Sequence, residues 1–273
     1  MTIYLVIFIF ILWKKVEYEY AYIEMIITTN TDSLLNKRSE LDVIISQTNP
    51  DIIGITEILS KNRDMEPQDS ELKINGYDHF SNLEKCKRGV IIYIKESLNA
   101  VLLSQMEDNN FEESVWCQVR LTNEDVLTLG VIYRSPNSPP ENHDHLRSMI
   151  IEANELKSSH LLIMGDFNYP DINWRTETTP PDVNNMATKF MECLRDCFLY
   201  QHVKDPTHYR GSQNPNTLDL LITNEEGMID NITLNAPIGK SHHVCINFEF
   251  NCYVETLVNH QSKYIYHKGD LNS

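Results

Sequence analysis

The segment His160-Leu161-Leu162-Ile163-Met164-Gly165-Asp166-Phe167-Asn168 is the most hydrophobic strand-like run in the body of the chain, and it ends in polar residues. A short apolar run of this kind predicts a buried strand. Asp166 and Asn168 are two positions apart, so an extended chain points both side chains to one side, where they can act on one bound group. Gly165 lets the backbone turn sharply or pass close to a ligand. The segment therefore predicts a strand that ends in a functional site.

Other predicted strands also carry a polar side chain at one end. The apolar run 51–57 ends at Glu57, and the run 126–133 ends at Tyr133. The remaining strands of this kind are 22–30 with Asn30, 218–223 with Asp219, and 243–250 with His243. Hydrophobic strands that end in carboxylates and carboxamides are typical of a rigid scaffold that presents a site. We expect these side chains to converge.

The order of strands and helices predicts the fold class. Further strands are expected at 89–95 and 114–121, and helices at 34–49, 146–156 and 186–197. Asp32 or Ser33 is expected to cap the first helix, and Pro50 to end it. About ten strands with few helices do not fit a regular strand–helix alternation. The pattern favours an α/β fold, a four-layer α/β sandwich in which two packed mixed β-sheets are flanked by helices.

The charge and cysteine content narrow the class of function. The 273 residues include 23 Lys and Arg against 39 Asp and Glu, a net charge of −16. This balance argues against non-specific coating of nucleic acid, but it leaves room for a phosphodiesterase, whose metal site needs local carboxylates. The six cysteines form no C-x-x-C pair. We therefore predict buried free thiols and a reducing compartment, cytoplasmic or nuclear.

The two ends of the chain differ from its middle. The run 3–13 is strongly apolar but shorter than the roughly 20 residues that span a bilayer, and it lacks the features of a signal peptide. A short membrane anchor, a stray translated leader and an extra buried segment all remain open. We expect a leader or anchor at 1–20, a domain at 21–252, and a C-terminal extension at 253–273 that begins a linker. His143 and His145 have no partner cluster and are expected to be solvated.

Six segments, taken together and in order, resemble a known family. They are 29–37, 51–57, 132–136 (Ile-Tyr-Arg-Ser-Pro), 164–170, 217–221 (Thr-Leu-Asp-Leu-Leu) and 241–243. The chain resembles the endonuclease/exonuclease/phosphatase superfamily of deoxyribonuclease-I-like proteins, and within it the endonuclease domain of non-LTR retrotransposons. The resemblance implies a Mg²⁺-dependent phosphodiesterase, with Mn²⁺ as a substitute, that nicks DNA. We expect the protein to be a monomer. It also implies a reverse transcriptase domain as a partner outside this chain.

The resemblance implies roles for the metal and the attacking water. Glu57 would hold Mg²⁺, an ion that prefers oxygen ligands. Asn30 and Asn168 would help to bind that ion and the scissile phosphate. Asp166 would orient the attacking water and take its proton.

The remaining matched residues would bind the substrate or stabilise charge. Tyr133 would donate to a phosphate oxygen, and Arg134 and Ser241 would contact the substrate. His243, oriented by Asp219, would stabilise the charge of the transition state.

One position departs from the family pattern. The family motif is Ser-Asp-His, whereas this chain has Ser241-His242-His243. His242 would take the place of that aspartate as a metal ligand, near the attacking water, where an imidazole suits Mg²⁺ poorly. We therefore expect weakened activity, as in a decaying copy of an element. The alternatives are a catalytically dead element fragment and a membrane-associated lipid or inositol phosphate phosphodiesterase of the same superfamily.

Overall fold

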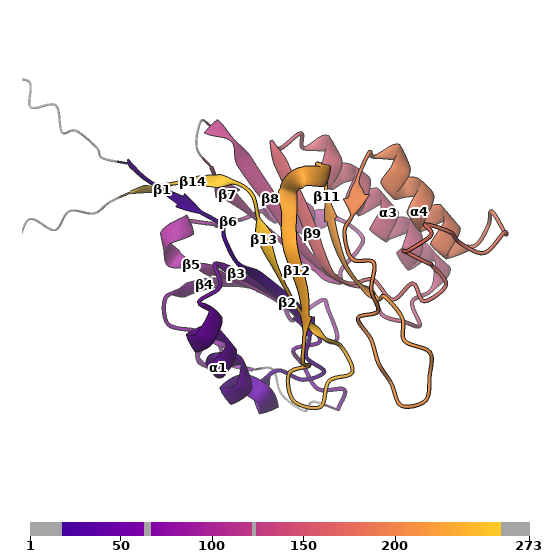
Figure 1. The fold of residues 1–273 in the computed structure, drawn as a ribbon, viewed down its shortest axis with the longest axis horizontal. Helices are drawn as coiled ribbons and strands as arrows, with labels where there is room; N and C mark the ends of the chain where they lie inside the picture. Colours follow the sequence, from indigo (N-terminus) through magenta and orange to yellow (C-terminus); the bar gives the residue numbers. More distant parts are fainter. Residues whose placement is uncertain (1–17, 63–66, 122–123, 258–273) are drawn as a thin grey trace, which may run out of the picture.

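Two six-stranded β-sheets pack face to face in the computed structural model, which describes residues 18–62, 67–121 and 124–257. Helices cover the outer faces of both sheets (Figure 1). The architecture is thus a four-layer α/β sandwich, and the predicted fold class is confirmed.

The first sheet contains the strands that carry Asn30 and Glu57. Its order is β12-β13-β2-β3-β5-β4, and only β2 and β3 are parallel neighbours. The strands span Ile26–Asn30 (β2), Ile52–Thr56 (β3), Tyr77–Asn82 (β4), Val90–Lys95 (β5), Ile229–Asn235 (β12) and Cys245–Phe250 (β13). Since β2 and β3 run side by side in the same direction, their carboxyl ends meet at one edge.

The second sheet contains the strands that carry Tyr133, Asp166 and Asp219. Its order is β10-β11-β9-β8-β7-β6, and β8 and β9 are parallel. The strands span Val101–Leu102 (β6), Ser114–Arg120 (β7), Val126–Tyr133 (β8), His160–Asp166 (β9), Tyr200–Gln201 (β10) and Asp219–Thr223 (β11). A separate two-stranded ribbon pairs β1 (Tyr18–Tyr22) with β14 (Tyr253–Leu257).

The helices form the outer layers. They are η1 (Leu35–Lys37), α1 (Arg38–Thr48), α2 (Asp69–Leu72), η2 (Glu96–Leu98), η3 (Ser104–Asp108), α3 (Pro140–Glu155), α4 (Met186–Asp196) and η5 (Glu226–Met228). Leu41 of α1 belongs to a buried cluster with the outer face of the first sheet. Residues of α3 and α4 form a second cluster with the outer face of the second sheet. Every central strand is therefore buried on both faces, which explains its continuous apolar sequence.

The core between the sheets brings the two halves of the site together. Gly54 of β3 faces Met164 and Val131 of the other sheet, and a Cβ on Gly54 would lie 2.5 Å from the Met164 methyl carbon. The absence of a side chain there lets the sheets approach closely beside the strand ends that carry the polar residues.

Several sequence predictions need correction. The expected strand 22–30 is divided into β1 and β2. Neither Asp32 nor Ser33 caps α1, because both adopt positive φ (41° and 84°) in a turn, and the helix begins at Arg38 without a side-chain cap. Asn49 in the left-handed region ends α1 immediately before Pro50. The first part of the expected C-terminal extension pairs with β1 as β14.

The predictions about thiols and membrane contact have different outcomes. All six cysteines are free, as expected, and all are buried except Cys197, which is half-buried. The apolar run 3–13 lies outside the described residues. Within the described part, no helix has both the length and the apolar character needed to cross a bilayer.

Candidate active site

Asp166 lies at the centre of a row of three residues at one edge of the second sheet. It ends β9, where Tyr133 of β8 and Asp219 of β11 are its register partners on either side. Since β11 is antiparallel to β9, Asp219 begins its strand yet reaches the same edge. The second sheet therefore brings together three of the predicted site residues.

Gly165 is required by the backbone at this edge. Its φ is +130°, and a Cβ would lie 2.1 Å from the carbonyl oxygen of Ile132 on β8. A side chain larger than hydrogen cannot fit against that carbonyl without moving the backbone. Gly165 therefore allows β9 to keep its register with β8 immediately before Asp166.

The loop after Asp166 is held in a fixed shape. The Asn168 backbone N–H donates to Asp166 Oδ1 at 3.1 Å, and Asn168 Nδ2 donates to the Arg134 carbonyl at 2.8 Å. Asn168 has a positive φ of 50°, which an asparagine tolerates better than most residues. Its carboxamide is partly exposed at the site, with the amide nitrogen committed to the backbone.

Arg134 holds this loop through its guanidinium. The buried guanidinium donates from Nε to the Phe167 carbonyl at 2.6 Å and from Nη2 to the Asn168 carbonyl, and it lies 4.2 Å from the Tyr169 ring centroid. The sequence predicts a substrate contact for Arg134, but the structure commits its guanidinium to the loop. His143 is not simply solvated either, because its Nδ1 lies 3.0 Å from the Tyr169 hydroxyl.

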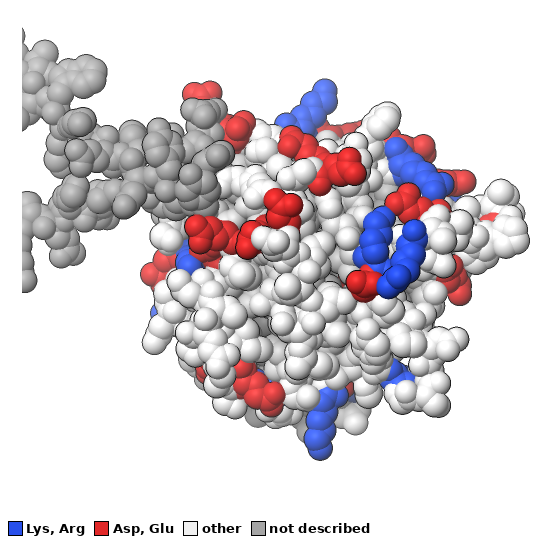
Figure 2. Space-filling view, viewed as in Figure 1, with Lys and Arg blue, Asp and Glu red and all other residues white. Residues whose placement is uncertain are grey.

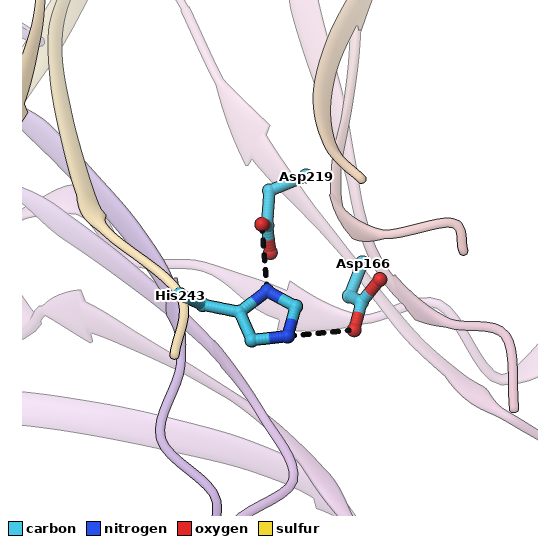
Figure 3. A group of neighbouring side chains, drawn as sticks. All are labelled: Asp166, Asp219 and His243. Carbon is cyan, nitrogen blue, oxygen red and sulfur yellow. Dashed lines mark hydrogen bonds and ion pairs between the residues drawn. The ribbon is translucent and has the colours of Figure 1, made fainter. Parts of the chain in front are cut away.

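His243 lies between two carboxylates (Figure 3). Its Nδ1 is 2.8 Å from Asp219 Oδ2, and its Nε2 is 3.8 Å from Asp166 Oδ2. Both aspartates are 1% exposed and His243 is 8% exposed. Asp219 is held in turn by its backbone N–H, which donates to Thr207 Oγ1 at 3.0 Å. The histidine predicted from the sequence is thus oriented by the aspartate predicted for it.

The buried charges shift each other's pKa. Burial disfavours the charge on His243, but the Asp219 and Asp166 carboxylates outweigh it and raise the pKa of His243 to about 9. Burial also raises the pKa of Asp166 to about 7, opposed by the charge of His243 and reinforced by Asp219. At neutral pH the pair therefore combines a protonated imidazole with a carboxylate that can accept a proton.

Asn30 joins the two sheets at the site. It is fully buried, and its Nδ2 donates both to Glu57 Oε1 at 3.0 Å and to Asp166 Oδ2 at 2.9 Å. Its Oδ1 accepts from the Asp32 backbone N–H at 3.0 Å. The carboxamide therefore fixes the position of Glu57, on the first sheet, relative to Asp166, on the second.

Ser241 and Tyr133 complete the predicted set. Ser241 is buried, and its hydroxyl donates to the Asn30 carbonyl at 2.6 Å and accepts from the His243 backbone N–H at 3.2 Å. Its contacts hold Asn30 and His243 in position. Tyr133 is 3% exposed, and burial together with the charges of Glu57 and Asp166 raises the pKa of its hydroxyl.

His242 lies outside the buried group formed by Asp166, Asp219 and His243. It is exposed, and its ring centroid lies 6.0 Å from that of His208. The sequence predicts His242 as a metal ligand. Among the described residues, the one group of His, Cys, Asp or Glu side chains that could hold a metal with three or more ligand atoms is Asp166, Asp219 and His243, within 4.8 Å of one another.

Arg88 and Asp32, two charged residues that were not predicted as site residues, lie beside Glu57. Arg88 Nη2 contacts Asp32 Oδ1 at 2.5 Å and also contacts Glu57 Oε2. Arg88 is 8% exposed. Burial disfavours the charge on Arg88, but both carboxylates outweigh it and raise its pKa. The sequence signal was weak, because a single arginine before an apolar strand is common on protein surfaces.

The charges on the surface are mixed. On the face drawn in Figure 2, basic side chains lie among acidic ones, and the middle of the face is largely uncharged. This face therefore presents no continuous basic strip, in keeping with the net charge of −16.

Comparison with known proteins supports the fold. The endonuclease-reverse transcriptase family matches residues 127–247. The endonuclease domain of TRAS1, a telomere-specific non-LTR retrotransposon, is 16% identical and has a TM-score of 0.65, covering 84% of this chain and 98% of its own. The 3′-5′ exonuclease NExo from Neisseria meningitidis is 14% identical with a TM-score of 0.63, covering 83% and 99%. None of the curated proteins matches the chain.

A third structure has the same fold. The AP endonuclease LMAP from Leishmania major is 12% identical with a TM-score of 0.63, covering 84% of this chain and 88% of its own. Structural matches at identities this low establish the fold alone. The family match is made in sequence, over the segment that contains Tyr133, Asp166, Asp219 and His243. Residues 127–247 thus match the endonuclease-reverse transcriptase family, and the chain has the fold of these endonuclease and exonuclease structures.

Proposed function

We propose that this protein is a divalent-metal-dependent phosphodiesterase that nicks DNA, derived from the endonuclease of a non-LTR retrotransposon. The observation that carries the proposal is the His243 imidazole between the buried carboxylates of Asp219 and Asp166, with Asn30 joining Asp166 to Glu57. The match to the endonuclease-reverse transcriptase family supports this substrate class, and a reverse transcriptase domain is the partner that we propose with it.

The residues present fit a hard divalent cation. Glu57 and Asp32 direct carboxylate oxygens to one shared nitrogen of Arg88, so the two carboxylates converge on one point. Oxygen ligands of this kind suit Mg²⁺ and Mn²⁺. The Asp166–Asp219–His243 group fits such an ion less well, because both imidazole nitrogens already face carboxylates. We therefore place the metal at Glu57, beside Asn30, and keep His243 for the substrate.

The chain's own residues divide the reaction between them. Asp166 accepts a proton from the attacking water, for which a pKa of about 7 is well suited. The water oxygen bonds to phosphorus, the bond from phosphorus to the leaving oxygen breaks, and that oxygen takes up a proton from solvent. Protonated His243 donates a hydrogen bond to the phosphate as negative charge develops on it. A bound divalent cation would neutralise phosphate charge.

The remaining polar groups position the reactants. Tyr133 stays neutral, since its pKa is raised, and can donate to a phosphate oxygen. Asn168 presents its carboxamide oxygen to the site, because its amide nitrogen is bound to the Arg134 carbonyl. Arg134 and Ser241 act indirectly, by holding the Asp166 loop and the Asn30 backbone.

The substitution of His242 for the usual aspartate weakens this activity in our proposal. His242 is exposed at the rim, next to His208 and directly before His243. A carboxylate there would add negative charge near the cation, whereas an imidazole adds none. This observation also favours a second candidate, a catalytically dead fragment that keeps the fold.

Nicking of a supercoiled plasmid tests the proposal. We expect the purified chain to convert supercoiled to relaxed circles with Mg²⁺ or, more strongly, with Mn²⁺, and to stop when EDTA is added. Asp166→Ala and His243→Ala are the controls against a contaminating nuclease. If the wild-type chain relaxes no more plasmid than these variants with either metal, the protein is a dead fragment.

A further inference from the structure

Arg88 is the only guanidinium that the described contacts place on Glu57, and a single nitrogen of it serves two carboxylates. Nη2 contacts Glu57 Oε2 and Asp32 Oδ1, the latter at 2.5 Å. A nitrogen shared in this way stands where a cation that bridges the two carboxylates would have to stand. We propose that Arg88 is a built-in counter-ion that competes with the divalent cation for Glu57 and Asp32. The inference rests on the proposed metal site.

The backbone fixes Arg88 in this position. The Leu59 N–H donates to the Arg88 carbonyl at 2.8 Å, and the Ile58 N–H donates to the Gly89 carbonyl at 3.4 Å, so the turn is bound to the two residues after Glu57. Gly89 has a φ of +71°, and a Cβ there would lie 2.6 Å from Ile58 Cγ1. Arg88 therefore lies beside Glu57 because of the main chain, and not only because of the flexibility of its side chain.

The bonding of the guanidinium is incomplete, as expected for a temporary occupant. Nε and Nη1 are buried and find no hydrogen-bond partner among the described residues. A guanidinium that serves only as a structural ion pair usually forms two parallel bonds to one carboxylate. Here one nitrogen contacts both carboxylates. A cation that takes several oxygen ligands can occupy the place of that nitrogen.

The arrangement has a consequence for metal affinity. Without metal, Arg88 neutralises two carboxylates that would otherwise repel each other. For the cation to bind, Arg88 Nη2 must move away from the two carboxylates. The guanidinium then remains nearby, and its positive charge repels the cation. Removal of Arg88 therefore strengthens metal binding and destabilises the metal-free fold. If Arg88 only positioned Glu57, its removal would weaken both metal binding and the fold.

Direct Mn²⁺ titration of the full chain, with free Mn²⁺ followed by electron paramagnetic resonance, tests this. We expect Arg88→Met to bind Mn²⁺ at least about tenfold more tightly than the wild type, since a unit like charge near a divalent ion is strongly repulsive at short range. Arg88→Lys keeps the charge and should bind as the wild type does. Lys95→Met is the matched control, because Lys95 ends the same strand that Arg88 precedes and pairs with Asp51 at 2.7 Å.

The outcomes separate the inference from the proposed function. The inference is overturned if the wild type binds Mn²⁺, Glu57→Gln abolishes that binding, and Arg88→Met does not tighten it. The metal site would then still stand. Arg88→Gln repeats the test should Arg88→Met fail to fold. Absence of Mn²⁺ binding in the wild type, in Arg88→Met and in Arg88→Gln overturns the metal site and the inference together. Tight binding in Arg88→Met or Arg88→Gln, with wild-type affinity in Arg88→Lys, supports the inference.

Discussion

Asp166 and Asp219 face each other as direct register partners on β9 and β11, and the imidazole of His243 contacts both carboxylates. Two buried carboxylates in adjacent positions repel each other, and the protonated histidine between them offsets that repulsion. The orientation of His243, the proton affinity of Asp166 and the stability of this end of the fold are therefore coupled.

Asp219→Asn should reduce the nicking rate on the order of 10³- to 10⁴-fold without unfolding the protein, because the amide cannot hold the protonated imidazole in its orientation. The measurement is the plasmid-nicking rate, with circular dichroism to verify folding. The titration of His243, followed by nuclear magnetic resonance, should move to lower pH. An unchanged rate would show that Asp219 does not act through His243.

Stability should fall between pH 7 and pH 9 in the absence of metal. The folded pKa of His243 is about 9, above its ordinary value of 6.5, so its contribution is complete below pH 6.5 and is lost as the pH rises through 9. The full loss is about 3 kcal/mol. Asp166 has released its proton near pH 7, so the window above that pH reports mainly His243.

Chemical denaturation in EDTA across this window gives the measurement. His243→Gln should flatten the pH dependence, while His242→Gln, at an exposed position, should leave the slope unchanged. Equal slopes for the wild type and His243→Gln would contradict the assigned ion pairs.

His242→Asp should raise the Mg²⁺-dependent nicking rate on the order of 10- to 100-fold, because it restores a carboxylate beside His243. His242→Asn has a similar size but no charge and is the control. A rate that rises equally in both variants would mean that removal of the imidazole matters, and not the new charge.

Gly165→Ala should destabilise the protein by more than about 3 kcal/mol, since the new Cβ would lie 2.1 Å from the Ile132 carbonyl oxygen at a φ of +130°. Gly227→Ala is the matched control, because a Cβ there meets nothing within 4 Å. Thermal unfolding of both variants gives the comparison. A Gly165→Ala variant as stable as Gly227→Ala would mean that β9 does not lie against β8 in this register.

Arg134→Lys should lower the free energy of unfolding by about 2–3 kcal/mol, because an ammonium cannot reach the Phe167 and Asn168 carbonyls together while it covers the Tyr169 ring. Arg175→Lys, in an exposed ion pair with Asp205, should change it by less than about 0.5 kcal/mol. Equal effects of the two substitutions would argue for a solvent-exposed, substrate-facing Arg134 instead.

The sequence predicted the central strands and missed the edges of the sheets. β8 matches its prediction residue for residue, because a strand that is buried on both faces has a continuous apolar sequence. β4 and β12, by contrast, lie at the two edges of the first sheet and alternate only weakly between buried and exposed residues. Edge strands satisfy part of their backbone with water, so their sequences carry little hydrophobic signal.

The candidate site divides in the same way. Local pattern was enough to place Glu57 and Asp166 at strand ends, since an apolar run followed by a carboxylate is visible in the sequence. It was not enough for Arg134 and Ser241, whose polar groups turn to the backbone of the Asp166 loop and of Asn30. A side chain's partner depends on segments that are distant in sequence, and no local pattern encodes it.

The sequence by itself determined which polar side chains end the hydrophobic strands, because this is a local property of each segment, and the resemblance of six ordered segments implied the reaction class. Only the tertiary structure decided that Asn30 bridges the two sheets, that His243 lies between two aspartates, and that Arg88 shares Glu57 with Asp32. The first two relationships depend on the packing of one sheet on the other, which is close at Gly54. The third depends on the order of β2, β3 and β5 within the first sheet.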